Sequence, residues 1–183
     1  MIRIDRPRRL IALLVGVAAL VMTVGSVAAS GATHASATIV NGVGTTIGWA
    51  RFVEDADGRL HVNVKVEGLT PGLHGIHVHG VGLCEGPAFG SAGLHHNPLG
   101  ALHGLDEPAG AHAGDLPNLV VNVKGRGHLD VVSDRATLSL GGVSVFDGNG
   151  SALIIHALED DQESTSGTGN SGARVACGVI NSD

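Results

Sequence analysis

Apolar residues recur at every second position in the segment 60–67, where Leu60, Val62, Val64 and Val66 alternate with polar side chains. This period of two predicts a strand that buries one face and exposes the other. No segment sustains the period of an amphipathic helix. Glycine supplies 29 of the 183 residues, more than twice its usual share of about 7%, which favours short strands joined by tight turns.

Further strands are predicted wherever similar short runs lie between turn residues. Seven or eight such strands in antiparallel order imply an all-β sandwich or flattened barrel. Two long stretches break the pattern, a Gly/Pro/His-rich loop at 80–117 and a polar loop at 159–173, and loops of this length are usually functional. The predicted strands cover residues 45–53, 60–67, 75–79, 119–124, 128–132, 136–140, 151–158 and 174–180.

The N-terminus carries four arginines among its first nine residues, then an uncharged run at 10–24, then the small residues Ala35-Ser36-Ala37. This order predicts a secretory signal peptide over residues 1–37 and an exported mature domain over 38–183, either secreted or held in the cell envelope. Cleavage after Val27-Ala28-Ala29 is an alternative position, and the sequence does not decide between export by the Sec pathway and by the twin-arginine pathway. An uncleaved anchor is the alternative, but the run is shorter than the ~20 residues that span a bilayer, so no stable membrane insertion is expected.

The charge balance argues against a nucleic-acid partner. Removal of residues 1–37 takes away four arginines and Asp5, so 11 basic residues become 7 and 17 acidic residues become 16. The net charge changes from −6 to −9, whereas nucleic-acid binding needs a basic surface. The only cysteines are Cys84 and Cys177. In an exported protein two cysteines most often form one disulfide, with free thiols as the alternative.

The histidines give the strongest chemical signal, since the chain has 11 of them. His77 and His79 stand two apart on a predicted strand, so both side chains lie on one face and can chelate a metal. His74 faces the other way and is interpreted as a satisfied polar residue. His34 falls in the predicted leader, and His61 and His128 take outward strand positions, so none of these three is a predicted ligand.

The loop at 80–117 supplies a second set of metal-binding side chains. Three imidazoles and one carboxylate suit tetrahedral zinc, and a metal would hold together a loop with so little apolar content. His156 lies in an apolar run and becomes a plausible further ligand beside the pair on the strand. The loop candidates are His95, His96, His103, His112 and Asp115.

Taken in order, these motifs resemble the copper/zinc superoxide dismutases of the exported bacterial type. The likeness covers essentially the whole mature chain, and several motifs at consistent spacing make it specific. The segments that carry it are Gly72-Leu-His-Gly-Ile-His-Val-His79, Ser91-Ala-Gly-Leu-His-His-Asn-Pro98, His103-Gly104, His112-Ala-Gly-Asp-Leu-Pro-Asn118, His156, Asp160-Asp161 and Gly172-Ala-Arg-Val-Ala-Cys-Gly-Val-Ile180.

The resemblance implies an eight-stranded antiparallel Greek-key barrel that converts superoxide to dioxygen and hydrogen peroxide by Cu(II)/Cu(I) cycling. It implies one copper ion and one zinc ion in each chain, with the chain either a monomer or a homodimer. The matched copper ligands are His77, His79, His95 and His156, and the matched zinc ligands are His95, His103, His112 and Asp115.

Other roles follow from the same resemblance. His95 is the imidazole that both metals share, and in the family's scheme it also carries a proton. Asp160 bonds one ligand of each metal, His77 and His103. Arg174 attracts the superoxide anion. The pair Cys84 and Cys177 ties the metal loop to the last strand.

Several departures from the family pattern bear on these expectations. Gly80 follows His79, and His96 follows the shared histidine, which leaves a spare imidazole near the site. The loop at 159–173 is acidic and holds no lysine, which puts fast electrostatic steering in doubt. The first strand is expected to be very short, at 37–40.

Two other classes of function are the alternatives. A copper carrier or storage protein without dismutase activity would favour Cys and Met ligands, but no Met follows Met22. A purely structural β-sandwich would not need all seven ligand positions.

Overall fold

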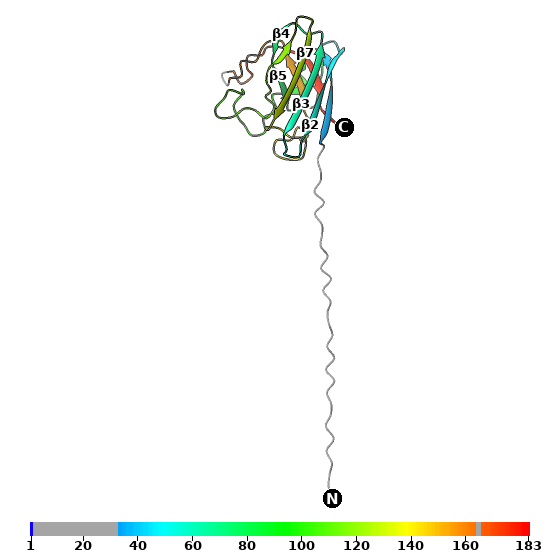
Figure 1. Ribbon diagram of the computed structural model, residues 1–183, viewed down its shortest axis with the longest axis vertical. Helices are drawn as coiled ribbons and strands as arrows, with labels where there is room; N and C mark the ends of the chain where they lie inside the picture. Colours follow the sequence, from blue (N-terminus) through cyan, green and yellow to red (C-terminus); the bar gives the residue numbers. More distant parts are fainter. Residues whose placement is uncertain (2–32, 164–165) are drawn as a thin grey trace.

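The computed structural model describes Met1, residues 33–163 and residues 166–183, and within them the chain is all-β with no α-helix (Figure 1). The described residues include no helix long and apolar enough to cross a membrane. The elements are β1 (His34–Asn41), β2 (Thr46–Glu54), β3 (Leu60–Glu67), β4 (Gly72–His74), β5 (Ile76–His79), the 3₁₀ turn η1 (Gly90–Ala92), β6 (Leu119–Val121), β7 (Arg126–Ser133), β8 (Ala152–His156), β9 (Arg174–Val179) and β10 (Asn181–Ser182).

The strands form one antiparallel sheet that curls into a nearly closed barrel. Its order is β4-β6-β7-β3-β2-β1-β9-β8-β5, with β10 paired to β1. The two strands at the ends of this path, β4 and β5, are separated in the chain by Gly75 alone. Because this single residue joins the two edge strands, the two edges of the sheet lie close together. The connections β3 to β4 and β7 to β8 skip over neighbouring strands, which confirms the predicted Greek-key barrel.

The barrel interior is filled by the apolar side chains that alternate along the strands. Phe52, Leu60, Leu119 and Leu153 are fully buried there, and burial of each such side chain contributes about 1.5–3 kcal/mol. The strand β5 is buried on both faces. Its apolar residues belong to the core, while its histidines lie on the other face beneath the long loops. The core therefore fixes the strand that carries the first predicted metal ligands.

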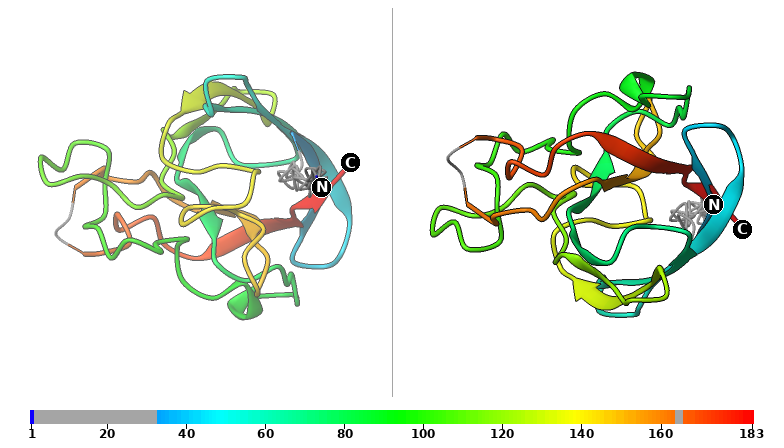
Figure 2. Two further views of the ribbon diagram at one scale, coloured as in Figure 1. Left: turned by 90° about the horizontal axis from the view of Figure 1, so that it is seen from below. Right: turned by 90° about the horizontal axis from the view of Figure 1, so that it is seen from above.

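The two long loops leave the barrel on the same side and run next to each other (Figure 2). The backbone N–H of Asp106, in the first loop, donates to the carbonyl oxygen of Gln162, in the second, at 3.1 Å. Gly104 takes a positive φ of 103°, and a Cβ there would lie 2.2 Å from the same Gln162 oxygen. Glycine is thus required where the loops meet.

The first strand begins earlier than predicted. β1 begins at His34, not at residue 37, and Ala35 and Ala37 are buried against the core with Ala35 paired to Phe52. A cut after residue 37 would remove half of this strand. The alternative cut after Ala29, like the rest of the predicted leader up to residue 32, lies outside the described residues.

One predicted strand is wrong. Residues 136–140 are an irregular segment with a single isolated bridge, between Thr137 and Ser144. The carboxylate of Glu54 accepts the backbone N–H groups of Leu138 at 2.5 Å and Ser139 at 2.7 Å, and also the Ser139 hydroxyl at 2.6 Å. These donors are therefore not free for a sheet ladder. The alternation that suggested a strand arises because Ala136 and Leu138 are buried against the barrel core.

We expect Glu54→Ala to destabilise the fold by about 1–3 kcal/mol at pH 7, since it leaves two backbone donors without their charged acceptor. Burial raises the pKa of Glu54, but the hydrogen bonds from Ser139 and Leu138 outweigh it and lower the pKa below 4.5. The stabilisation is therefore complete above about pH 4.5 and is lost as the pH falls through the folded-state pKa. Urea unfolding at pH 7 and pH 3 tests this, and a difference between wild type and variant that does not shrink at pH 3 contradicts it.

Candidate metal centre

Four histidines from three parts of the chain converge on one point. His77 and His79 come from β5, His156 ends β8, and His95 lies just after η1. β5 and β8 are paired, and His79 also forms an isolated bridge with His95, so the sheet register sets their approach. One ring nitrogen from each of the four lies within 4.8 Å of the others. The structure thus brings together all four predicted copper ligands.

Three imidazoles of this cluster are anchored through one ring nitrogen by acceptors outside the two ligand sets, and each presents its other nitrogen. The anchored atoms are His77 Nε2, bonded to Asp160, His79 Nδ1, 3.0 Å from the Gly93 carbonyl oxygen, and His156 Nδ1, 3.1 Å from the Gly172 carbonyl oxygen. Their other nitrogens, His77 Nδ1, His79 Nε2 and His156 Nε2, are buried and lack any hydrogen-bond partner in the described part of the chain. Buried unpaired nitrogens are costly unless a ligand takes their lone pairs, so the donor set fits a metal ion.

The electrostatics keep these imidazoles neutral. Burial lowers the pKa of His77 to about 3, of His79 to about 2 and of His156 to about 4. A histidine must be deprotonated at the ligating nitrogen to bind a metal. At neutral pH these three side chains therefore offer free lone pairs without having to lose a proton.

The predicted zinc ligands form a second cluster around the carboxylate of Asp115. Its Oδ1 lies 3.2 Å from His95 Nδ1, 3.3 Å from His103 Nδ1 and 3.3 Å from His112 Nδ1. Its Oδ2 accepts the backbone N–H groups of Gly104 at 2.9 Å and His112 at 3.1 Å. Three nitrogens and one oxygen at this separation fit the donor set of tetrahedral zinc.

Asp115 stays ionised in this cluster. Burial raises its pKa, but hydrogen bonds with His103, His112 and His95 and with the Gly104 N–H outweigh burial and hold the pKa well below its usual range. Burial lowers the pKa of His103, yet its bonds to Asp115 and Asp160 raise the net value to about 9. Zinc would therefore compete with a proton for the Nδ1 of His103.

His95 belongs to both clusters. Its ring stacks on that of His77 with centroids 4.0 Å apart, and its Nδ1 faces Asp115. Nε2, on the opposite edge of the ring, is the atom left for the first cluster. A single imidazole thus separates the two candidate metal positions, as the resemblance implied.

Asp160 links the two clusters by bonding one histidine of each at the ring nitrogen that does not face the candidate metal position. One carboxylate oxygen bonds His77 Nε2, and the other lies 3.1 Å from His103 Nε2. Burial raises the pKa of Asp160, but its bonds to His103 and His77 outweigh burial and hold the pKa below the usual range. An ionised carboxylate that accepts from Nε2 of both rings fixes their orientation and directs Nδ1 of each toward its candidate metal position.

Sequence reasoning missed how Asp160 is itself held. The Asn118 side chain donates from Nδ2 to the Asp160 carbonyl oxygen and accepts the Asp160 N–H at Oδ1, both at 2.8 Å. A Cβ on Gly169 would lie 2.1 Å from an Asp160 oxygen, so only glycine fits there. Asn118 closes the motif that begins at His112, but its spacing gives no signal that it reaches a residue 42 positions away.

Arg174 is half-buried beside the first cluster. Its Nη1 donates to the Phe89 carbonyl oxygen at 2.7 Å and its Nη2 to the Gly93 carbonyl oxygen at 2.5 Å. It lines a hollow together with Pro87, Ala88, Gly172 and Ala173. Phe89 and Gly93 lie in the loop that the Cys84–Cys177 disulfide ties to β9, as the resemblance implied. These carbonyl oxygens hold the guanidinium, and no acid among the described residues pairs with it, so its charge remains available to an anion.

The remaining histidines lie outside both clusters. His74 is buried, with Nδ1 2.6 Å from the His156 carbonyl oxygen and Nε2 2.9 Å from the Thr70 carbonyl oxygen, which agrees with its interpretation as a satisfied polar residue. His96, named as a loop candidate, points instead to the Val143 carbonyl oxygen at 3.3 Å. The other three histidines that were not predicted as ligands, His34, His61 and His128, are exposed.

The comparisons with known proteins agree with this geometry. Residues 46–180 match the family model of copper/zinc superoxide dismutase. The chain is 41% identical over 148 residues to Superoxide dismutase [Cu-Zn] 2 of Aquifex aeolicus, covering 80% of this chain and 85% of that protein. It is 40% identical over 146 residues to the superoxide dismutase-like protein YojM of Bacillus subtilis, which covers 78% of this chain and 73% of that protein.

Two solved structures extend the comparison. A superoxide dismutase-like protein from Bacillus subtilis superposes with a TM-score of 0.71 at 39% identity, covering 82% of this chain and 98% of that one. The clock protein EA4 superposes with the same TM-score at 34% identity, and the match covers 83% of this chain and 96% of that one. Relatives with this barrel thus include proteins named for dismutase activity and proteins named otherwise.

Proposed function

Because the chain belongs to the copper/zinc superoxide dismutase family, we propose that it converts two superoxide ions and two protons into dioxygen and hydrogen peroxide, with one copper and one zinc ion per chain. The observation that carries this proposal is the shared position of His95 between two complete ligand sets. The first set would hold copper through His77, His79, His95 and His156. The second would hold zinc through His95, His103, His112 and Asp115.

A copper ion in the first set would supply the electron exchange, since imidazole supports both Cu(II) and Cu(I). The chain's own residues supply the rest. Arg174 binds the superoxide anion beside the cluster. His95 can hold a proton at Nε2 and release it to the reduced substrate, while Asp115 fixes the ring through Nδ1. Asp160 keeps His77 and His103 oriented throughout.

Metal analysis combined with a superoxide assay tests this function. We expect the full folded domain, reconstituted with both ions, to bind one copper and one zinc per chain and to be active. Replacement of copper by zinc in the first set should abolish activity. If the reconstituted protein binds one copper ion per chain but no zinc, His103, His112 and Asp115 do not form a zinc site.

The main alternative is a copper/zinc-binding domain without significant dismutase activity. It is favoured by the relatives named superoxide dismutase-like and by the clock protein EA4, which share this fold. The same assay separates the two functions, because a non-enzymatic domain would bind both ions and leave the rate of superoxide loss unchanged.

We also propose that the protein works outside the cytoplasm. The arginine-rich start followed by an uncharged run is typical of an export signal. The Cys84–Cys177 disulfide suits an oxidising compartment. Fractionation of cells that produce the full chain, with detection in the medium and envelope, tests this location.

We expect Arg174→Ala to lower kcat/KM for superoxide about tenfold or more without loss of either metal, because a cation at a channel raises the on-rate of an anion. Salt should slow the wild type only weakly. Lys124, a further candidate for steering, lies in the turn after β6, beyond the Gly72 end of β4 and away from His77. Rates across a salt series check this, and a steep fall with salt in Arg174→Ala would show that other cations of the surface attract the substrate.

A further inference from the structure

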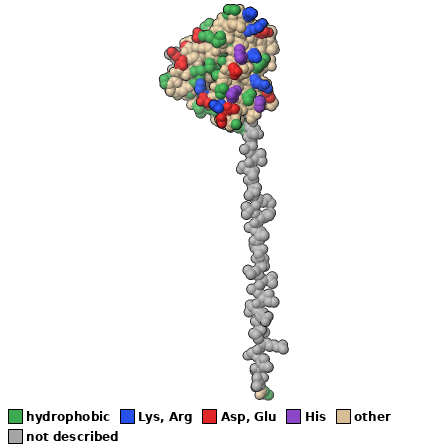
Figure 3. All heavy atoms as spheres, in the orientation of Figure 1, with side chains coloured by type: hydrophobic (Ala, Val, Ile, Leu, Met, Phe, Trp, Pro, Cys, Tyr) green, Lys and Arg blue, Asp and Glu red, His purple; other side chains and the backbone are tan. Residues whose placement is uncertain are grey.

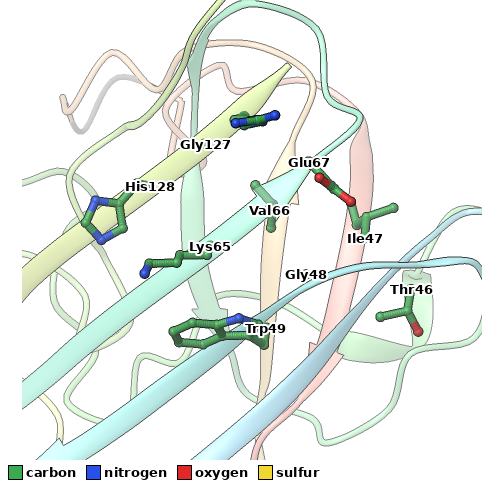
Figure 4. A pocket seen from close by; sticks show the side chains of 10 residues that line it. Thr46, Ile47, Gly48, Trp49, Lys65, Val66, Glu67, Gly127 and His128 are labelled. Atoms are coloured by element: carbon green, nitrogen blue, oxygen red, sulfur yellow. The ribbon is translucent and has the colours of Figure 1, made fainter. Parts of the chain in front are cut away.

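A hollow of about 570 Å³ lies on the outer face of the barrel, over β2, β3 and β7 (Figure 4). None of the residues that line it belongs to either histidine cluster. Its volume falls in the range of small-molecule sites, about 300–1,000 Å³. The hollow is therefore large enough for a ligand and separate from the candidate metal centre.

Trp49 provides the apolar wall of this hollow. It is the only tryptophan in the chain, which has no tyrosine. Its side chain is 44% exposed, whereas Phe52 and Phe89 are buried. An exposed indole inside a concave surface offers a flat, polarisable face to another ring. Ile47 and Val66 line the hollow beside it (Figure 4).

Two cations without ion-pair partners among the described residues line the hollow, and one of them lies beside Trp49. Sheet register places Lys65 directly opposite Trp49, with Nζ 5.5 Å from the centre of the indole ring. Arg126 lines the same hollow, paired in register with Glu67. Among the residues that the structure describes, neither cation has a carboxylate oxygen within 4.0 Å, whereas Arg59 and Arg135 each do.

The surface around the hollow also carries positive and imidazole groups, although the whole chain is acidic. His128 lies across β3 from Trp49, in register with Lys65. On this face Lys, Arg and His side chains are interspersed with Asp and Glu (Figure 3), so the charge balance is taken from the residues that line the hollow. Glu67 is the one acid that lines the hollow, against two cations. The local charge therefore favours an anion over a cation.

We propose that this hollow binds a small organic anion that contains a flat ring. The ring packs on Trp49, and the anionic group binds between Lys65 and Arg126. Glu67 accepts a hydrogen bond from an N–H or O–H of the ring. This site is independent of the proposed dismutase activity, since it shares no residue with it.

Titration of the metal-loaded full domain tests the proposal, with Trp49 fluorescence as the probe and calorimetry as a second readout. Adenosine 5′-monophosphate and benzoate supply a ring with an anion, adenosine supplies the ring alone and inorganic phosphate the anion alone. We expect saturable binding of at least one ring-bearing anion with Kd of roughly 1 mM or below. The ring alone and the anion alone should bind at least about tenfold more weakly.

Surface variants give the matched controls. Lys65→Gln and Arg126→Gln should each weaken binding about two- to fivefold, as expected for partly exposed charge pairs. Arg51→Gln, on the same strand as Trp49 but outside the hollow, should bind like wild type. Absence of saturable binding below about 10 mM for both ring-bearing anions, or equal affinity in all three variants, overturns the proposal.

Discussion

Cys84→Ser should lower the free energy of unfolding by about 2–5 kcal/mol, which shifts the folding equilibrium at least about 30-fold. The disulfide joins residues 93 positions apart. Its loss frees the loop that the bond closes between Cys84 and Cys177 in the unfolded chain, which is worth about 4–5 kcal/mol in the chain-entropy model. The result is measured as the urea midpoint of the metal-free domain at fixed slope.

The same change should also reduce activity. Arg174 donates to the carbonyl oxygens of Phe89 and Gly93, in the loop that Cys84 anchors to β9. A looser loop leaves the guanidinium less well placed for an anion. Treatment of the wild type with a reductant should reproduce the Cys84→Ser midpoint, and the variant itself should not respond. A wild-type midpoint that is unchanged by reduction would falsify the structural role of the disulfide.

The alternation of side chains predicted most of this fold because it is a local property of a strand. The segment 60–67 and the strand at 174–180 were found within one residue of their predicted ends. The same rule placed His77 and His79 on one face, which the structure confirms. The pairing of distant strands is not local, and only the family resemblance gave the barrel order.

Where sequence reasoning failed, a tertiary contact decided the outcome. The run at 136–140 alternates like a strand, but Glu54 binds its backbone donors. The strand predicted at 75–79 is present as β5, but sequence reasoning missed the short strand β4 just before it, which forms by pairing with β6. β1 extends back to His34 because Ala35 fits the core. None of these partners is near in sequence.

The ligand residues could be predicted, and the residues that hold them could not. A ligand such as His103 is recognisable by its chemical type and by its neighbours in a motif. Asn118 supports the site through two hydrogen bonds to the Asp160 backbone, and Gly93 supports it through a carbonyl oxygen that any residue could offer. Because every residue type has a backbone carbonyl oxygen, the sequence does not show which of these oxygens accepts a hydrogen bond from a ligand.

Asp160→Asn should weaken the binding of copper and zinc about 10–100-fold while leaving all seven direct ligands in place. The carboxylate accepts from both His77 Nε2 and His103 Nε2. An asparagine has one carbonyl oxygen and one N–H₂ group, so one of the two rings loses its acceptor and faces a donor. That ring can then change tautomer or rotate, and the nitrogen it presents to the metal is no longer fixed.

Competition with a chelator of known affinity measures each metal separately, and it shows which ring has lost its partner. A larger loss for copper identifies His77 as that ring, and a larger loss for zinc identifies His103. Asp161→Asn is the matched control, because Asp161 is the neighbouring acid and is exposed, and among the described residues its carboxylate accepts hydrogen bonds only from Glu163 and Asn170 of its own loop. Activity should fall with copper occupancy in the Asp160 variant. If both metals bind Asp160→Asn as tightly as they bind Asp161→Asn, the carboxylate does not orient the ligands, and the two clusters are held by the loops alone.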